Sequence, residues 1–486
     1  MRVLYATSEC APWIKTGGLG DVAAALPAAL HAQGVDARVL MPAYRNVLGA
    51  ANATREIATL ALSPPWPAAR LRAATLPSGV AAFLIECPSL FDREGGPYQD
   101  AHDSDYGDND LRFAFLSRVA AWLSMAGSPL VWRPDVLHCN DWQTGLAPAY
   151  LAAADVARAA TVMTIHNLAF QGSFAGNRCT ALGLPSEFFA IDGVEFYGQT
   201  SFLKAGVVYA DALSTVSPTY AREIQRPTLG FGFEGLLAQR ADVLTGILNG
   251  IDLDIWNPAS DPSIAVRYDT DTLSRKAGNK AALQRALGLE PIPDAVLLGV
   301  VSRLTWQKGA DLLAELVPRL ADTHAQFAIV GRGSAEVEAR LAALARATPS
   351  RVSVALRFDE ALAHLVEAGA DAFLMPSRYE PCGLNQMYSQ RYGTPPVARA
   401  TGGLVDSITD ATPQALARGA ASGFLFGDAT LDAFEAAVRR MLGAHAQPTT
   451  WNSIQRAAMA RDFGWEKSAA DHVRMYERAI DRRQSG

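Results

Sequence analysis

The stretch "RVLYATSECAPWIKTGGLGDVAAALPAAL", residues 2–30, has the pattern of a buried strand, a glycine-rich turn and a helix. A turn of this kind at a helix N-terminus is suited to binding a phosphate. Gly18, Gly20 and Ala23 also match the G-x-G-x-x-A spacing of a dinucleotide-binding turn. Two interpretations compete: a phosphate-binding loop, or an ordinary glycine-rich loop whose helix is capped by Asp21.

The surrounding residues argue against a dinucleotide. About ten residues separate Thr7 from Gly17, whereas a dinucleotide-binding turn follows its strand directly. The next strand, within "DARVLMPAY" (36–44), does not close on the acidic residue that would bind a ribose. Lys15 and Asp21 flank the glycines, so a lysine charge can meet a phosphate and a carboxylate can favour the positive end of the helix. We therefore predict a phosphorylated ligand that is not NAD.

The composition is that of a globular protein without a surface for polyanions. Of the 486 residues, 49% are hydrophobic and 19% are charged, and the length fits about two or three domains. The net charge of -6 argues against nucleic acid as a partner. Five scattered cysteines without a C-x-x-C pair indicate neither a zinc site nor a disulfide framework. We expect a cytoplasmic protein without a bound metal or a membrane partner, because no secretory signal or membrane-spanning apolar stretch is visible.

Lysine is rare in this chain. Only six of the 43 basic residues are lysines, at positions 15, 204, 276, 280, 308 and 467. Because arginine serves nearly everywhere else as the generic cation, a lysine in a turn marked by glycine or tryptophan indicates a specific task. Lys15 and Lys308 are two such cases. The alternative is that codon bias disfavours lysine and that these lysines remain by chance.

Short apolar runs alternate with helical patterns in two successive series. The first series lies at residues 2–7, 35–42, 80–86, 135–140, 161–167 and 212–217, and the second at 296–302, 326–331, 351–356, 371–377, 395–398 and 423–427. Such runs predict an α/β fold with two Rossmann-like, doubly wound parallel sheets, which we expect to face each other across an active-site cleft. We place an N-terminal domain at 1–245, a C-terminal domain at 246–460 and, at 461–486, a closing amphipathic helix that packs back on the first domain. Another amphipathic helix is predicted at 110–127, and the helix after Asp21 is expected to end at Gly34.

In folds of this kind the ligand groups follow the strands. "VSRLTWQKG" (301–309) follows the first strand of the second series and places Arg303 and Lys308 across a turn that opens a helix. A guanidinium fork and a point charge at a helix start suit a diphosphate. Two exposed cations in a loop are the alternative.

The segment at 376–408 is the densest in candidate groups. Glu380 precedes a turn that can expose the N–H groups of Cys382 and Gly383, and this mixture of acceptor and donors suits a polyhydroxylated ligand. Thr401 and Gly402 lie in "TGGL", a second glycine turn that suits a phosphate. A nucleophilic Cys382 is not supported, because no histidine lies near it in the sequence.

Two histidines follow predicted strands of the first series. We expect His138 to be a buried, hydrogen-bonded histidine, whereas His166 fits a buried and a ligand-facing role equally well. Asp141 beside Trp142 pairs a carboxylate with an aromatic face, as sugar sites do, although Asp141 also fits a helix N-cap. Tyr98 follows a glycine pair and is predicted to lie on a mobile loop over the cleft.

Together these motifs resemble those of the bacterial glycogen synthase and plant starch synthase family. The resemblance extends from residue 1 to "FGWEKSAADH" (463–472) and rests on "KTGGLGDV" (15–22), "DREGGPY" (92–98), "HCNDWQTG" (138–145), "TIHNLAFQG" (164–172), "FLKAGVVYADALSTVSPTYAREI" (202–224), "GILNGIDLDIWNP" (246–258), "SRLTWQKG" (302–309), "PSRYEPCGLNQMY" (376–388) and "TGGLVDS" (401–407). It implies a glycosyltransferase with two facing Rossmann-like halves. It also implies transfer of glucose, generally from ADP-glucose in bacteria, to the non-reducing end of an α-1,4-glucan with retention of configuration and without a cofactor.

The resemblance also implies roles for single residues. Phosphate contacts fall on Lys15, Gly18, Arg303 and Lys308, and sugar contacts on Glu380, on the N–H groups of Cys382 and Gly383, on His166 and on Asp141. Tyr388 stands where many wider relatives carry a second Glu, as it does in glycogen and starch synthases. Tyr379, Asn385 and "PPVARATGG" (395–403) depart from the pattern of many members and leave the fine substrate preference open.

Two other classes of function compete with this one. One is a transferase of the same fold that acts on a small acceptor, such as a sucrose- or trehalose-type synthase. The other is a non-catalytic glucan-binding relative, which would tolerate loss of the charges that this chain keeps at its phosphate positions. A pyridoxal-phosphate phosphorylase is not supported, since no lysine fits that family's cofactor pattern. The oligomeric state is not predicted.

Overall fold

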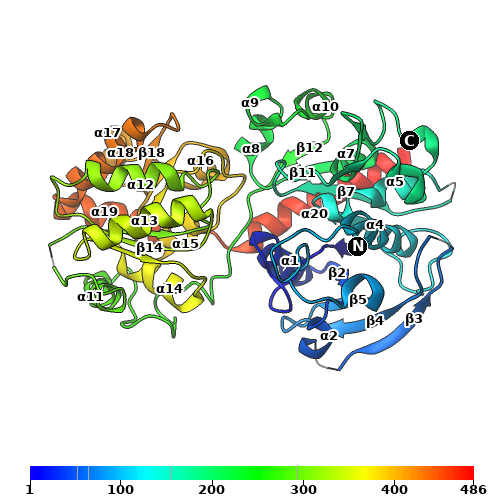
Figure 1. The fold of residues 1–486 in the computed structure, drawn as a ribbon, viewed down its shortest axis with the longest axis horizontal. Helices are drawn as coiled ribbons and strands as arrows, with labels where there is room; N and C mark the ends of the chain where they lie inside the picture. Colours follow the sequence, from blue (N-terminus) through cyan, green and yellow to red (C-terminus); the bar gives the residue numbers. More distant parts are fainter. Residues whose placement is uncertain (52, 64, 155, 293, 486) are drawn as a thin grey trace. The chain divides into compact units, whose positions relative to one another are not determined.

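The computed structural model describes residues 1–51, 53–63, 65–154, 156–292 and 294–485. It divides the chain into two compact units, which are coloured by sequence in Figure 1. Unit 1 comprises Met1–Gly250 and Trp465–Gly486, and unit 2 comprises Ile251–Gly464. The chain therefore leaves unit 1 after Gly250 and returns to it at Trp465.

Unit 1 is built on a nine-stranded sheet with a parallel core. Across the sheet, the strands are β12 (Leu244–Gly246), β11 (Ala212–Thr215), β7 (Ala160–Ile165), β6 (Val136–Asn140), β1 (Arg2–Ala6), β2 (Asp36–Pro42), β5 (Ala81–Glu86), β4 (Ala69–Thr75) and β3 (Arg55–Leu60). All neighbours from β12 to β5 pair in parallel. A small antiparallel sheet orders β8 (Ser173–Ala175), β10 (Gln199–Ser201) and β9 (Glu195–Phe196).

The edge strands β3 and β4 correct the prediction of a purely parallel sheet. They pair antiparallel with each other, and β4 also pairs antiparallel with β5. The connection at 76–80 is too short for the crossover that parallel neighbours require. Exposed charged residues such as Arg55 and Arg70 interrupt both strands, so no apolar run marks them.

The helices of unit 1 differ in part from those predicted. They are α1 (Gly18–Ala32), α2 (Val47–Ala50), α3 (Pro88–Phe91), α4 (Asn109–Leu123), α5 (Leu146–Ala152), α6 (Arg178–Ala181), α7 (Phe202–Tyr209), α8 (Pro218–Glu223), α9 (Pro227–Gly230), α10 (Glu234–Gln239) and α20 (Trp465–Ser485), with 3-10 turns η1 (Trp142–Thr144) and η2 (Ser186–Phe188). The N-cap of α1 is Gly17, so the capping role predicted for Asp21 is wrong, although this carboxylate does lie in the first turn. Gly34 follows the helix end with φ of 82°, as predicted. The prediction of an amphipathic α4 is wrong, because most of its residues are buried.

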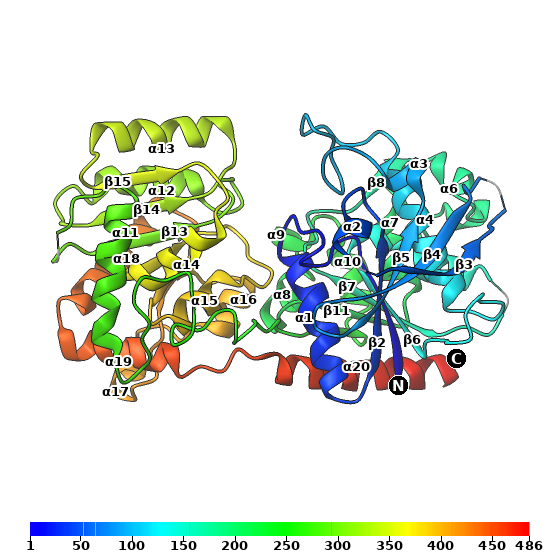
Figure 2. The ribbon, with the colours of Figure 1, turned by 90° about the horizontal axis from the view of Figure 1, so that it is seen from below.

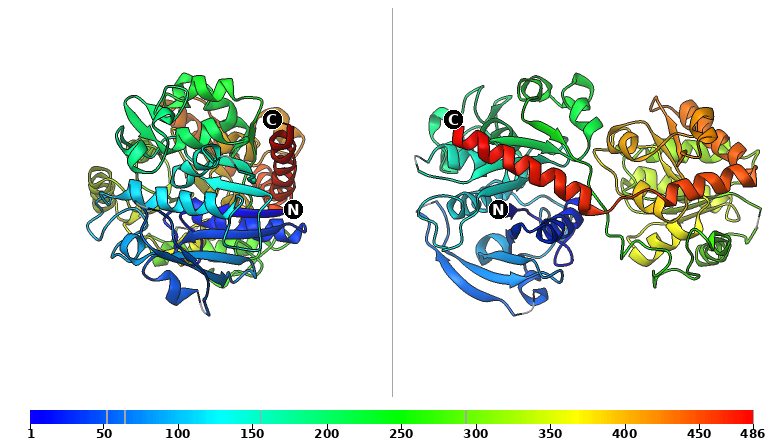
Figure 3. Two further views of the ribbon diagram at one scale, coloured as in Figure 1. Left: turned by 90° about the vertical axis from the view of Figure 1, so that its right-hand side faces the viewer. Right: turned by 180° about the vertical axis from the view of Figure 1, so that it is seen from behind.

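The last helix, α20, packs on unit 1 against α1 and β7. Figures 2 and 3 show it in red on one side of this unit. Its buried residues recur every three or four positions and confirm the predicted amphipathic helix: Trp465, Ser468, Ala469, His472, Met475, Tyr476 and Ala479. No helix in the described ranges is both long and apolar enough to cross a membrane.

Unit 2 is built on a six-stranded, fully parallel sheet, as predicted. Its strands, in order, are β15 (Val352–Ala355), β14 (Gln326–Val330), β13 (Leu297–Val301), β16 (Ala372–Met375), β17 (Pro396–Arg399) and β18 (Phe424–Phe426). Its helices are α11 (Lys276–Ala286), α12 (Ala310–Arg319), α13 (Ala335–Ala347), α14 (Glu360–Gly369), α15 (Asn385–Arg391), α16 (Gly402–Ser407), α17 (Pro413–Ala417), α18 (Leu431–His445) and α19 (Pro448–Met459), with a 3-10 turn η3 (Leu273–Arg275). Alternate residues of β14 enter two separate apolar clusters, Phe327 and Ile329 one and Ala328 and Val330 the other. Both faces of the sheet are therefore covered.

The main sheet of each unit reverses its strand order at one point. The reversal lies between β1 and β6 in unit 1 and between β13 and β16 in unit 2. Ligands of doubly wound sheets bind outside the carboxyl ends of the strands at such a switch point. The loops after these four strands carry most of the predicted site residues.

Candidate active site

A buried carboxylate holds the glycine loop after β1. Glu9 is 3% exposed and accepts hydrogen bonds from the Thr16 amide at 2.5 Å and from the Thr16 hydroxyl at 2.6 Å. The Tyr98 hydroxyl also donates to Glu9, and it lies 2.8 Å from the Ser8 hydroxyl. This network fixes the loop that carries Lys15 into α1.

The glycine loop presents a cation next to a helix start. Lys15 Nζ lies 2.9 Å from a carboxylate oxygen of Asp21, and both side chains are partly exposed. Gly18 is the first residue of α1 and is exposed. The first N–H groups of a helix have no partner within it, so this loop offers the donors that a phosphate needs.

Tyr98 is anchored on both sides, in contrast to the mobile loop predicted for it. The Asn109 side chain donates to the Tyr98 carbonyl at 2.9 Å. The buried Arg112 donates to the preceding carbonyl, that of Pro97, at 2.8 Å. Burial raises the pKa of the Tyr98 phenol well above its usual value, so the hydroxyl keeps its proton and donates a hydrogen bond to Glu9. Tyr98 therefore supports the glycine loop through Glu9.

Glu9 and Ser8 were not predicted from the sequence. Both follow β1 within a few residues, at the switch point of unit 1. The rule that ligand groups follow strands would have indicated them. The glycine pattern further along the chain is the stronger signal, but Glu9 is what holds it in place.

Asp141 follows β6 in a left-handed backbone conformation, with φ of 55°. Its Oδ1 atom accepts hydrogen bonds from the amide of His166 at 2.7 Å and from that of Asn167 at 3.4 Å. The carboxylate thus reaches across to the loop after β7. Asp141 does occupy the N-cap position of η1, but its side chain makes no capping hydrogen bond there. Burial raises the pKa of Asp141 to about 7, because the two amide bonds offset only part of the loss of water.

His166 begins the loop after β7 and is neutral at pH 7. Its Nε2 atom lies 2.9 Å from Asn140 Oδ1. Burial is the main cause that lowers its pKa to about 3. The side chain is nevertheless half-buried, not enclosed. The structure therefore offers a hydrogen-bonding imidazole here, not a charge.

The other two candidates of this region belong to the interior of unit 1. His138 is 0% exposed and is hydrogen-bonded to Tyr476 at 2.8 Å and to Thr164 at 2.6 Å, which confirms the predicted buried histidine. The ring of Trp142 packs edge-on against Phe113, with 5.0 Å between the ring centroids, and it lies against Gly172 so closely that a Cβ there would overlap it. Trp142 therefore serves packing more than an open face for a sugar.

Unit 2 brings Lys308 and Glu380 together across its switch point. Lys308 Nζ lies 2.6 Å from Glu380 Oε2, and the two side chains are 20% and 6% exposed. The Ser377 hydroxyl donates to the same oxygen at 2.9 Å. Sequence reasoning gave these two residues separate tasks and did not predict their ion pair. A cation and a carboxylate thus meet near the carboxyl ends of β13 and β16.

The loop after β13 is clamped by an arginine that was not predicted. Arg378 donates to Asp311 at 2.7 Å, and its guanidinium lies 4.6 Å from the centre of the Trp306 ring. Its amide also bonds to the Gln307 carbonyl at 2.8 Å. Arg303, in the same loop, is exposed. The clamp therefore holds the segment that carries both candidate phosphate cations.

Two glycine turns of unit 2 pack backbone on backbone. Gly383 and Gly402 have φ of 71° and 45°, and a Cβ at Gly402 would overlap the carbonyl oxygen of Glu380. The Gly403 amide donates to that carbonyl at 3.2 Å. Cys382, between these contacts, is buried at 6% exposure. The "TGGL" turn that begins at Thr401 therefore holds the Glu380 turn in place.

Tyr388 lies in a stack of rings. Its ring is 3.7 Å from that of Trp256, centroid to centroid, at an angle of 12°. The His364 ring stacks on Trp256 as well, at 3.9 Å. The position at which wider relatives carry a second Glu is thus used for packing in this chain.

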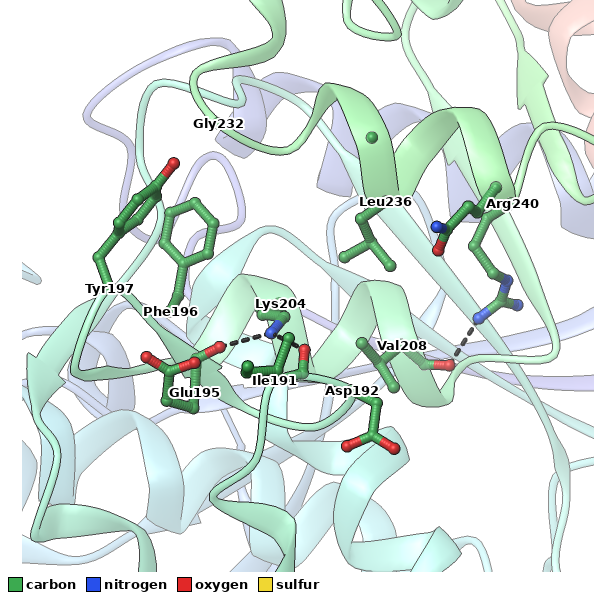
Figure 4. Close-up of a pocket in the computed structure, with 12 residues that line it drawn as sticks. Ile191, Asp192, Glu195, Phe196, Tyr197, Lys204, Val208, Gly232, Leu236 and Arg240 are labelled. Carbon is green, nitrogen blue, oxygen red and sulfur yellow. Dashed lines mark hydrogen bonds between the residues drawn. The ribbon is translucent and has the colours of Figure 1, made fainter.

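The cavity drawn in Figure 4 lies in unit 1, away from these residues. It measures about 650 Å³, and none of the predicted site residues lines it. Its two cations are engaged with main-chain carbonyls: Lys204 donates to Ile191 and Glu195, and Arg240 to Val207 and Val208. Among the described residues, no group of three or more His, Cys, Asp or Glu side chains is placed to hold a metal ion.

Comparisons with known proteins identify the family. Residues 2–239 match the family model described as starch synthase catalytic domain, and residues 290–456 match glycosyl transferases group 1. The chain is 55% identical over 476 residues to a glycogen synthase of Aromatoleum aromaticum, covering 98% of this chain and 96% of that one. It is 51% identical over 480 residues to a glycogen synthase of Nitrosomonas eutropha, covering 98% and 96%.

Solved structures show the same relation. The catalytic domain of starch synthase IV from Arabidopsis thaliana, bound to ADP and acarbose, superposes with a TM-score of 0.87 at 29% identity and 99% coverage of both chains. A sucrose-phosphate synthase from Thermosynechococcus elongatus, at 17% identity and a TM-score of 0.59, shares the fold. The full-length matches at about half identity show that this chain belongs to the bacterial glycogen synthase family of starch-synthase-type glycosyltransferases.

Proposed function

We propose that this chain is a retaining glucosyltransferase that moves glucose from ADP-glucose to the non-reducing end of an α-1,4-glucan, as in glycogen synthesis. The observation that carries the proposal is the pairing of Lys308 with Glu380 at the switch point of unit 2, in a chain that matches glycogen synthases over its full length. A nucleotide sugar needs a cation for its diphosphate and an acceptor for its sugar hydroxyls within one small region. The ADP in the starch synthase structure supports the choice of nucleotide.

In unit 2 we assign the diphosphate to Arg303 and Lys308. An ammonium has three donors, so Lys308 can contact a phosphate while it keeps Glu380 as a partner. Glu380 and the N–H groups of Cys382 and Gly383 would then hold the glucose hydroxyls. Thr401 and Gly402 remain proposed phosphate contacts, next to the Glu380 turn that they support.

In unit 1 we assign further phosphate contacts to Lys15 and Gly18 and a sugar contact to His166. Asp141 would act mainly through His166, because its carboxylate holds the amide of that residue. Tyr98 would act through Glu9, as a support of the glycine loop.

We propose that configuration is retained by substitution on one face of the sugar. A double displacement needs a carboxylate on the face opposite the leaving group. Glu380 is paired with the phosphate cation Lys308, and Asp141 is engaged with two amides, so neither is offered as that nucleophile. The acceptor hydroxyl would approach from the side of the departing diphosphate, whose charge Arg303 and Lys308 stabilise. A glucosyl-enzyme trapped with a fluorinated sugar nucleotide would overturn this mechanism.

We also propose that the reaction requires no metal ion, because side-chain cations offset the charge of the diphosphate. Glucan synthesis should therefore be unchanged when EDTA is added to protein freed of divalent ions. A loss of activity that Mg²⁺ restores would contradict this. All five cysteines are buried and none forms a disulfide among the described residues, which supports a reducing, cytoplasmic location.

The proposed function is tested by a matrix of two donors and two acceptors. Purified protein is incubated with ADP-[¹⁴C]glucose or UDP-[¹⁴C]glucose, and with glycogen or a small sugar phosphate. We expect label in ethanol-insoluble glucan with ADP-glucose and glycogen. Label only in soluble product would favour the small-acceptor class, whose fold the sucrose-phosphate synthase shares. Glucan binding without any release of ADP would indicate a non-catalytic binder.

A further inference from the structure

Two consecutive residues at the end of β6 bind the same histidine. Asp141 holds the main chain of His166, and Asn140 contacts its ring at 2.9 Å. The contact follows from the sheet, because β6 and β7 are parallel neighbours in which Asn140 pairs with Thr164. The last side chain of one strand therefore reaches the first residue after the other.

The orientation of the Asn140 amide is fixed by the main chain. Its Nδ2 atom donates to the Ala6 carbonyl at 3.0 Å and to the His138 carbonyl at 3.4 Å, and the side chain is 0% exposed. A flipped amide would direct its own oxygen at two carbonyl oxygens, which cannot donate. The atom that faces His166 is therefore the amide oxygen.

An amide oxygen has no proton, so Nε2 of His166 must carry one. A neutral imidazole has a single N–H group, which leaves Nδ1 with a lone pair. Within the described part of the chain no hydrogen-bond partner is placed at Nδ1, and the ring is half-buried. The second nitrogen is thus an acceptor that a ligand can reach.

We infer that Asn140 selects the Nε2–H tautomer of His166 and thereby makes Nδ1 an acceptor for a sugar hydroxyl. The tautomer follows from geometry alone, whereas the sugar as ligand rests on the proposed function. A phosphate oxygen has no proton to donate, so this histidine discriminates in favour of hydroxyls. Asn140 is a positioning residue, and it acts on the substrate only through His166.

The tautomer is tested by NMR on the full chain labelled with [¹⁵N]histidine. Long-range ¹H–¹⁵N correlations distinguish a protonated from an unprotonated ring nitrogen, and loss of one set of signals in His166→Gln assigns it among the eight histidines. We expect a protonated Nε2 and an unprotonated Nδ1 for His166 between pH 6 and pH 8. The Nδ1–H tautomer, or an even mixture, would overturn the inference whether or not the protein synthesises glucan.

The role in binding is tested with Asn140→Leu and a matched control. Asn279 is also 0% exposed and bonds to the main chain of Val266, so Asn279→Leu reports the cost of burying leucine in place of a bonded asparagine. We expect Asn140→Leu to mix the tautomers and to lower kcat/KM by about tenfold, the worth of one hydrogen bond. Asn279→Leu should leave both unchanged.

Monodeoxy substrates identify the hydroxyl. Each monodeoxy ADP-glucose and each monodeoxy maltoside is assayed with the wild type and with Asn140→Leu. For one analogue, removal of the hydroxyl should lower kcat/KM about tenfold with the wild type. With Asn140→Leu the same removal should lower kcat/KM little further, because that variant has already lost the contact. A donor analogue would place the hydroxyl on the transferred glucose, and an acceptor analogue would place it on the glucan end. If every analogue lowered kcat/KM by the same factor with Asn140→Leu as with the wild type, the acceptor role of Nδ1 would be overturned.

Discussion

At the scale of single residues, burial acts in opposite directions on two neighbours. It raises the pKa of Asp141 to about 7 and lowers that of His166 to about 3, because in both cases it disfavours the charged form. At pH 7 His166 is therefore neutral, and about half of the Asp141 carboxyl groups keep their proton. The proposed diphosphate contacts, by contrast, keep cations at partly exposed positions, such as Lys15 and Arg303.

Asp141 gives a prediction about stability and pH. Its folded pKa lies above the ordinary value of 3.8, so the folded state retains a proton that the unfolded state releases. This contribution to stability is complete below about pH 4 and is lost as the pH rises through about 7. The unfolding free energy of Asp141→Asn minus that of the wild type should therefore increase by roughly 2–3 kcal/mol from pH 5 to pH 8. Urea unfolding at both pH values measures it, and a difference that does not change with pH would contradict the assignment.

Arg303 and Lys308 should differ in what their loss does. Each contact with the diphosphate is worth about 1.5–3 kcal/mol, so Arg303→Ala and Lys308→Ala should both lower kcat/KM for ADP-glucose at least about tenfold and leave glucan binding intact. Only Lys308→Ala should also lower the unfolding free energy, because it leaves the buried Glu380 without its cation.

The control for these variants is Arg340→Ala. Arg340 lies on α13 and pairs with Glu315 at 3.3 Å near the surface, so its loss should change neither turnover nor stability much. Near-normal turnover of Arg303→Ala would refute its assignment to the diphosphate. Equal stability of Lys308→Ala and the wild type would show that the pair with Glu380 is not formed in solution.

At the scale of elements, the Glu380 turn depends on the turn that opens α16. A Cβ at Gly402 would overlap the Glu380 carbonyl, and the residue has φ of 45°. Gly419 offers a matched control, because its φ is 63° but the nearest atom to a Cβ there, Ser453 Oγ, is 3.9 Å away. Gly402→Ala should lose most glucan synthesis, whereas Gly419→Ala should lose about 1 kcal/mol of stability and keep its turnover. Equal turnover of the two variants would contradict the proposed support.

The elements also differ in how well the sequence predicted them. Continuous apolar runs predicted the buried strands, because strands covered on both faces need such runs. They missed β3 and β4, whose charged edge residues break the pattern, and they could not show that α4 is buried on most sides. Glu9, Arg378 and the Lys308–Glu380 pair depend on contacts between loops that are distant in sequence, so no local pattern marks them. The amide of Asn140 is of the same kind.

At the scale of the whole molecule, unit 1 needs both ends of the chain. The Tyr476 hydroxyl of α20 bonds to His138 in β6, two residues before Asn140. The C-terminal helix therefore supports the strand that carries the Asn140 and Asp141 contacts to His166. Unit 2 is formed by the intervening chain and carries the Lys308–Glu380 pair.

The central claim is the transfer of glucose, with retention, to the non-reducing end of an α-1,4-glucan. It is tested most directly by extending glycogen briefly with ADP-[¹⁴C]glucose and digesting the product with β-amylase, which removes maltose from non-reducing ends through α-1,4 bonds. Nearly all of the label should be released as maltose in the first moments of digestion. Label that stays in the undigested glucan would show another linkage, another anomer or another end, and would contradict it.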